Sequence, residues 1–202
     1  MEFDYFQYGN PIYHKSDRDT DFSFYGDLEL KERKIYKVKV RPKMIYLIEL
    51  FYYEELTFIK FYPKIHENNP NRYKVCDIGL SNSEKRKLLN TCCSIVHDEI
   101  EKDKERLFAF VAQIYDRDNE KKREISVRFS IYRKQVTTFF KLENYSHLMI
   151  KDFNFYCMAK ASNKSFSKKI EAFITKAKKQ ESLVMEFITD RGRENIINRN
   201  IY

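Results

Sequence analysis

The feature that most constrains the fold is a helix signal at residues 81–103, in the middle of the chain. Ser81 stands three positions before Glu84, which is the pattern of a capping box, in which the two residues cap each other's backbone N–H groups. Apolar residues then recur at spacings of three and four, which indicates one face of an α-helix: Leu88, Leu89, Cys92, Ile95, Val96 and Ile100. Such a helix needs an apolar surface to cover, and strand-like segments precede and follow it.

The first 80 residues have the pattern of an antiparallel meander. Residues 35–40, IYKVKV, alternate apolar and charged side chains, which predicts a strand with one exposed face. Its lysines are interpreted as guards on an edge strand, with a binding stripe as the alternative. Residues 1–30 are predicted to be extended, and further strands are predicted at 44–53, 56–65 and 72–80.

Downstream of the helix, residues 106–115 are almost continuously apolar, which predicts a central strand buried on both faces. Residues 123–141 fit both a strand and a helix, and a helix is favoured because its pattern covers more residues. One or two strands are predicted within 147–162, and an amphipathic helix within 165–180 that extends to about Ile188.

This order of elements predicts an α+β fold with an antiparallel sheet of about five to seven strands and two or three helices packed on one face. Residues 1–180 are expected to form a single domain, and residues 181–202 a C-terminal helical extension or tail.

The chain is basic, with 38 Lys and Arg against 30 Asp and Glu and a net charge of +8. A basic surface favours nucleic acid or another polyanion. Asn, Lys, Ile, Tyr and Phe are all plentiful, as in proteins from AT-rich genomes, so codon bias explains part of the lysine excess and is the favoured interpretation of the charge. A nucleic-acid role is the alternative.

The four cysteines, at positions 76, 92, 93 and 157, form no CxxC motif, and neighbouring cysteines make a poor disulfide. They are predicted to be buried thiols in a reducing compartment. The first residues, MEFDYFQYGN, do not have the pattern of a secretory signal. The apolar runs are shorter than the roughly 20 residues that cross a bilayer. We therefore expect a cytoplasmic protein without a membrane partner.

Asp116 and Asp118 follow the predicted central strand, where α/β proteins often place reactive groups. Two carboxylates at this spacing can share a Mg²⁺ or Mn²⁺ ion, with Glu120 nearby. The segment DRDNE is also rich in the residues that turns prefer, and no histidine or further acid has a spacing that completes a site. A turn is favoured, and the two aspartates stay weak candidates for catalysis.

Basic residues are the favoured candidates for contact with a ligand or nucleic acid. Arg123, Arg128 and Arg133 are five residues apart, so each step turns about 140° around a helix axis and the three do not form one stripe. A solvated helix face is the alternative interpretation of each. The remaining candidates are Lys134, Lys168 and Lys169.

Other chemistry has little support in the sequence. The four histidines do not cluster, and Cys93 with His97 is a single pair, so no metal site is predicted. No glycine-rich phosphate loop, nucleophile elbow or HExxH motif is present. No cofactor is predicted.

Several segments together resemble an uncharacterised bacterial domain family that is common in Bacteroidota. They are LLNTCCSIVHDEI, LFAFVAQIYDRD, REISVRFSIYRK, FYCMAKASN and KKIEAFI, within residues 84–175. The resemblance implies a fold and a bacterial source but no reaction. The turn YDRDNEKKR has no glycine, unlike the turn of the family, so only Asp116, Arg123 and Arg128 stand in similar places.

Two classes of function remain. The first is a non-enzymatic binding or regulatory protein of the bacterial cytoplasm, in a defence, mobile-element or toxin–antitoxin system. It would act through a contact with a protein partner or a second copy, or through a basic surface that binds nucleic acid. The second is a metal-dependent enzyme that acts on nucleic acid or nucleotides through Asp116 and Asp118, which requires further polar groups to converge on Asp116.

Overall fold

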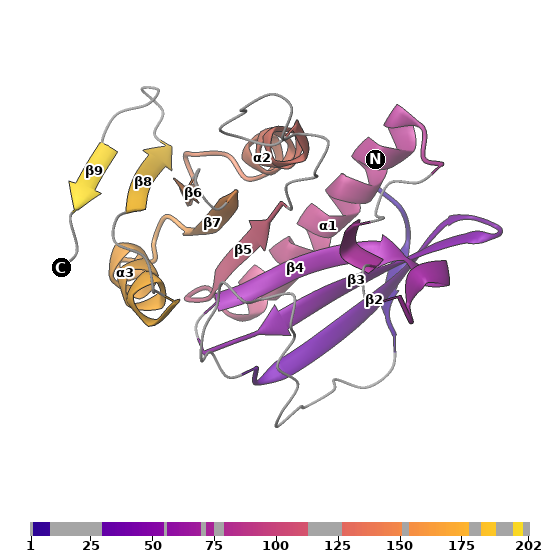
Figure 1. Cartoon of the computed structure of the whole chain (residues 1–202), viewed down its shortest axis with the longest axis horizontal. Coiled ribbons are helices and arrows are strands. Elements are labelled where there is room, and N and C mark those ends of the chain that lie inside the picture. The colour runs from indigo at the N-terminus through magenta and orange to yellow at the C-terminus, as the bar shows by residue number, and fades with distance from the viewer. Residues whose placement is uncertain are drawn as a thin grey trace.

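The structure is a computed structural model that describes residues 2–8, 30–54, 56–69, 72–74, 79–112, 127–150, 154–177, 183–188 and 196–199. Its strands form one nine-stranded sheet in the order β1-β2-β3-β4-β5-β7-β6-β8-β9 (Figure 1). The strands are β1 (Tyr5–Gln7), β2 (Glu32–Arg41), β3 (Met44–Tyr52), β4 (Leu56–Pro63), β5 (Leu107–Val111), β6 (Tyr145–Ile150), β7 (Phe155–Lys160), β8 (Leu183–Ile188) and β9 (Ile196–Arg199). The helices are α1 (Asn82–Lys102), α2 (Val127–Phe139) and α3 (Phe166–Ala177), with the short 3₁₀ helices η2 (Lys64–His66) and η3 (Arg72–Lys74).

Neighbouring strands are antiparallel except β4 and β5, which are parallel. A parallel pair needs a long crossover connection, and α1 lies in the connection between these two strands. The predicted α+β class with a mostly antiparallel sheet is therefore confirmed.

Helices cover both faces of the sheet. From α1, Cys93, Val96 and Ile100 pack with Phe129 of α2 against one face. From α3, Phe166 and Ile170 belong to the cluster on the other face, with Cys157 of β7. Figure 1 shows α2 and α3 on opposite sides of β6 and β7. The prediction that two or three helices share one face holds for α1 and α2 but not for α3.

The strongest local signals are confirmed. Ser81 caps α1, its hydroxyl accepts from the backbone N–H of Glu84 at 3.3 Å, and the Glu84 carboxylate accepts from the backbone N–H of Ser81 at 2.8 Å. The strand predicted to be central, β5, is fifth in the sheet order. The helix favoured at residues 123–141 is α2.

Within the described residues the sheet order includes nine strands, of which β1 and β9 have only three and four residues. Two details differ from the predictions. Residues 72–74 of the strand predicted at 72–80 form η3, because Tyr73 turns over the sheet to reach a buried carboxylate. The helix predicted to extend to Ile188 is wrong, because residues 183–188 pair as β8 with β6, whose backbone would otherwise be an open edge.

No helix within the described ranges is both long enough and apolar enough to cross a membrane.

Candidate functional site

A carboxylate is completely buried in the middle of β3. Glu49 is 0% exposed, and it lies between Ile35 of β2 and Lys60 of β4 in the sheet register. Its carboxylate accepts hydrogen bonds from the hydroxyls of Tyr62 at 2.8 Å and Tyr73 at 2.5 Å, and from the guanidinium of Arg33. A buried carboxylate is tolerated only with such partners.

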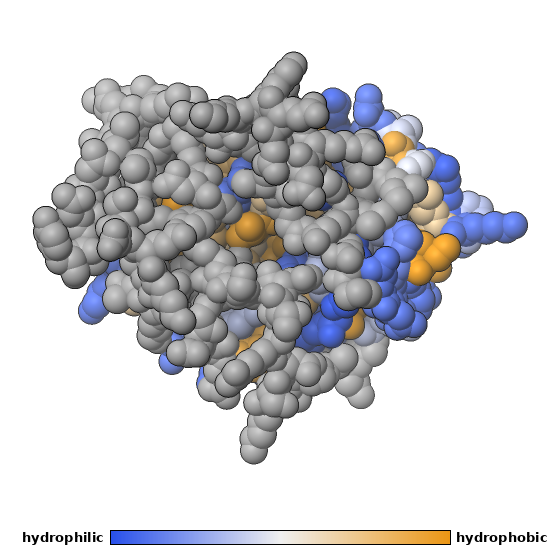
Figure 2. Space-filling model, in the orientation of Figure 1, coloured by the Kyte–Doolittle hydropathy of each residue, from blue (hydrophilic) through white to orange (hydrophobic). Residues whose placement is uncertain are grey.

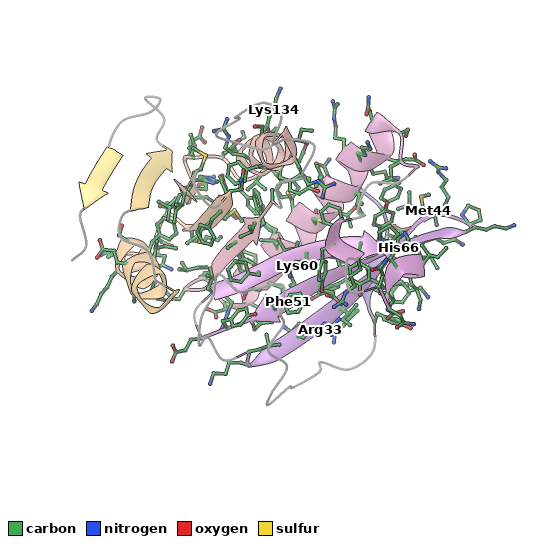
Figure 3. All side chains as sticks on the ribbon, in the orientation of Figure 1. Arg33, Met44, Phe51, Lys60, His66 and Lys134 are labelled. Carbon is green, nitrogen blue, oxygen red and sulfur yellow. The ribbon has the colours of Figure 1, made fainter. Side chains whose placement is uncertain are left out.

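Three cations surround this carboxylate and stack on aromatic rings. The Lys60 ammonium lies 4.1 Å from the ring centre of Tyr73, and the Arg72 guanidinium lies 4.7 Å from the same ring. The Arg33 guanidinium lies 5.5 Å from the ring centre of Phe51. These distances are within the range of cation–π attraction. Figure 3 shows Arg33, Phe51 and Lys60 on the neighbouring strands β2, β3 and β4.

The two arginines of this network each leave one buried donor without a partner. The buried Nε atoms of Arg33 and Arg72 have no hydrogen-bond partner, although a guanidinium carries five N–H donors. Both arginine side chains are only partly buried, so their outer N–H groups can meet an external anion. Hydrogen bonds between guanidinium and phosphate or carboxylate are strong.

The protonation states agree with this assignment. Burial would lower the pKa of Arg33, but the adjacent Glu49 carboxylate raises it above its ordinary value. Burial and the charge of Glu49 raise the pKa of Tyr62. The guanidinium therefore stays charged and the hydroxyl stays a donor at neutral pH.

Two lysines extend this charge toward β1. The Lys37 ammonium lies 5.7 Å from the ring centre of Phe6 and 5.4 Å from that of Tyr8. The Lys64 ammonium donates to the Tyr8 hydroxyl at 3.0 Å. We call the following five side chains, with the rings beneath them, the basic face: Arg33, Lys37, Lys60, Lys64 and Arg72.

Few carboxylates offset the basic face. Within the described ranges, its side chains form ion pairs with Glu49, through Arg33, and with Glu67, which lies 3.7 Å from Lys64. Figure 2 shows that the described residues at the right of the view, where the β2–β3 hairpin lies in Figure 1, are mainly hydrophilic, with small hydrophobic areas among them. Of the five cations, Lys37 and Arg72 form no ion pair with a described carboxylate.

A second buried carboxylate, Glu99 of α1, lies on the opposite face. It accepts from Lys34 at 2.7 Å, from Lys102 at 2.5 Å, and from the hydroxyls of Tyr36 and Tyr52. Burial would raise the pKa of Glu99, but the hydrogen bonds from Lys102, Lys34 and Tyr52 outweigh it and lower the pKa to about 2. This cluster attaches α1 to β2 and β3, so we interpret it as structural.

The basic residues predicted as candidates are not brought together. Arg128, Arg133 and Lys134 are on α2, whereas Lys168 and Lys169 are on α3, on the other side of the sheet. Arg133 donates to the Met149 sulfur at 3.5 Å and Lys169 to the carbonyl of Glu105 at 2.9 Å, while Lys134 and Lys168 are exposed. Lys134 lies beside α2, far from Arg33 in Figure 3.

Asp116, Asp118 and Arg123 lie outside the described residues, so their candidate roles stay predictions. None of the five cations of the basic face was a named candidate, although two signals were present. Arg33 and Lys37 share one face of a strand with period two, and Glu49 interrupts an apolar run. The edge-strand interpretation of the β2 lysines is wrong for Lys37, since β1 pairs with β2 at that position.

Within the described ranges, the face covered by α1 and α2 offers no comparable site. A cavity of about 50 Å³ lies there, lined mainly by apolar side chains that include Cys93, Val136 and Phe110, and it is too small for more than a few waters or a very small apolar molecule. Burial raises the pKa of the Cys93 thiol to about 12, so it stays protonated. Among the residues that the structure describes, no three His, Cys, Asp or Glu side chains are grouped so that they could hold a metal ion.

Comparison of the chain with protein-family models, with curated protein sequences and with solved structures found no match in any of the three. The resemblance to a Bacteroidota family therefore stays a prediction, and the geometry of the basic face is the basis for a functional proposal.

Proposed function

We propose that this protein binds nucleic acid, without catalysis, through the basic face. The observation that carries the proposal is the grouping of five cationic side chains from β2, β4, η2 and η3 on one face, each over an aromatic ring. Lysine and arginine contacts to phosphates provide most of the affinity of sequence-independent binding, because they release counterions from the nucleic acid.

The arrangement also lowers the entropic cost of binding. Lys60, Arg72 and Arg33 already lie over aromatic rings that the sheet and η3 hold in place. Side chains that are ordered before binding lose less freedom when a ligand binds. The basic face is therefore expected to bind phosphates better than the same charges on mobile surface side chains.

The proposed biological role is that of a binding or regulatory protein of the bacterial cytoplasm, in a defence, mobile-element or toxin–antitoxin system. The alternative, a metal-dependent enzyme that uses Asp116 and Asp118, stays a prediction, because these residues lie outside the described parts of the chain. No described side chain favours that alternative over the binding function.

The test is a salt-titrated mobility-shift assay on random-sequence RNA and DNA. The variant K37Q/K60Q/K64Q removes three cations of the basic face, and the matched control K134Q/K168Q/K169Q removes three cations from the helices α2 and α3. The first variant is expected to weaken binding uniformly across sequences and to reduce the slope of log affinity against log salt by about two. The control is expected to bind as the unmodified protein does.

Two results would contradict the proposal. One is the absence of binding at low salt, which would make the +8 charge a matter of composition and direct the search to a protein partner. The other is an equal loss in the control variant, which would move the interface to α2 or α3. Circular dichroism of both variants establishes that they are folded.

A further inference from the structure

The aromatic rings of the basic face differ in their access to solvent. Phe51 is 2% exposed, Tyr62 is 1% and Tyr73 is 9%, so a base cannot stack on these rings. Phe6 on β1 is 56% exposed. It presents a large aromatic surface to solvent at the end of the basic face that lies next to β1 and η2.

Two ammonium groups flank this exposed ring and its neighbour Tyr8. Phe6 is paired with Lys37 in the register of β1 and β2, and the Lys37 ammonium lies near both the Phe6 and the Tyr8 ring. Lys64 approaches Tyr8 from η2, at 4.6 Å from its ring centre. An exposed ring beside cations is the combination that single-strand binding proteins use, with bases on the aromatic side chains and phosphates on the charges.

We infer that the nucleic acid bound by the basic face is single-stranded and that one of its bases stacks on Phe6, with the adjoining phosphates on Lys37 and Lys64. This inference rests on the proposed function. A duplex keeps its bases stacked on one another, so it cannot place a base on Phe6 without unpairing. Stacking is tolerant of sequence because every base has an aromatic face.

The charges argue against a second copy of this chain on Phe6. Docking a copy with a net charge of +8 would bring like charges together around Lys37 and Lys64 and would remove water from both ammonium groups. A negatively charged single strand is attracted to both ammonium groups, and its phosphates replace the water that they lose.

The experiment compares Phe6→Ala and Phe6→Tyr with the unmodified protein by fluorescence anisotropy. The probes are a labelled single-stranded oligonucleotide of roughly 16 nucleotides, the same sequence as a duplex, and heparin, a polyanion without bases. The unmodified protein is expected to bind the single strand more tightly than the duplex. Phe6→Ala is expected to lower the single-strand affinity about ten-fold, with the salt slope and the heparin affinity unchanged, and Phe6→Tyr is expected to keep it.

Failure of this inference is distinguishable from failure of the proposed function. Binding to the single strand that Phe6→Ala leaves unchanged, or an equal loss on heparin, overturns the stacking role while the basic face still binds. A dimer that Phe6→Ala dissociates, seen by sedimentation, also overturns it and assigns the ring to a second copy. Absence of binding to all three probes overturns the proposed function and the stacking role together.

Discussion

Glu49 and Glu99 are buried carboxylates on opposite faces of the same part of the sheet, and both accept hydrogen bonds from two tyrosine hydroxyls. Around Glu99, the cations Lys34 and Lys102 are matched by Glu99 and by Glu32, which lies 3.9 Å from Lys34. Around Glu49, Arg33 is paired, whereas Arg72 adds further positive charge over the Tyr73 ring.

This difference separates a structural cluster from a candidate binding site. A carboxylate in balance with its cations has no capacity left for an external anion, and the helix that carries Glu99 covers its own cluster. The network around Glu49, in which the partly exposed Arg33 and Arg72 share one described carboxylate, keeps that capacity. Burial of charge therefore identifies both clusters, but only the charge balance identifies the one that binds.

The largest expected effect is on stability, in Glu99→Gln. The substitution keeps the shape of the side chain but removes the charge that Lys34 and Lys102 share, so we expect a loss of about 3–5 kcal/mol in the free energy of unfolding. Urea denaturation followed by circular dichroism measures it. Nucleic-acid affinity of the folded protein is expected to stay unchanged, and a weakened affinity would contradict the division between the two faces.

A pH effect of about 3 kcal/mol is expected from His147, which is 1% exposed and has its Nδ1 2.6 Å from the Tyr156 hydroxyl. Burial lowers the pKa of His147 from 6.5 to about 4. Between these pH values the unfolded chain binds a proton that the folded protein does not. Stability is therefore complete above pH 6.5 and is lost as the pH falls to about 4.

Urea midpoints measured from pH 7 to pH 4 test this expectation, with His147→Gln as the matched variant. The variant is expected to lose most of the pH dependence in this range. If the urea midpoint depended equally steeply on pH in both proteins, the acid sensitivity would belong to other groups. Glu99 is expected to add a loss of stability at lower pH, between about 4.5 and 2. In this range the unfolded chain protonates the carboxylate and the folded protein does not.

A smaller effect, with a sign that distinguishes the two faces, is expected for Glu49→Gln. Leaving a buried donor of Tyr62 or Tyr73 poorly satisfied costs about 1–3 kcal/mol of stability. Removing the one carboxylate at the centre of the network also frees the charge of Arg33, so nucleic-acid affinity at low salt is expected to rise several-fold. The shift assay measures this, and a fall in affinity of the folded variant would show that Glu49 positions the arginine for binding.

The smallest effect is expected for Asp116→Ala, since the sequence favours a turn at this position. Binding and stability are expected to remain within experimental error of the unmodified protein. Nuclease assays with Mg²⁺ and Mn²⁺ provide the check. A divalent-dependent cleavage that this substitution abolishes in a folded protein would restore the enzyme alternative.

Local signals in the sequence predicted much of the fold. The capping box of Ser81 and Glu84, the apolar stripe of α1 and the continuous apolar run of β5 each involve residues close together in the chain. The binding candidates named from the sequence, such as Lys168 and Lys169, are residues that lie close together along the chain, and they stay predictions. The basic face draws instead on β2, β4, η2 and η3.

The sequence by itself determined the α+β class and the central position of β5. These properties follow from periodicity and capping, which act over a few residues. The helical pattern of the sequence placed Glu99 on the solvated side of α1, which is wrong, since Glu99 is buried. Only the tertiary structure decided that Tyr73 turns back over Glu49, that residues 183–188 extend the sheet, and that Arg33, Lys60 and Arg72 converge. The physical reason is that a buried carboxylate and an open strand edge must be satisfied by whichever partners the folded chain brings to them, at any separation in sequence.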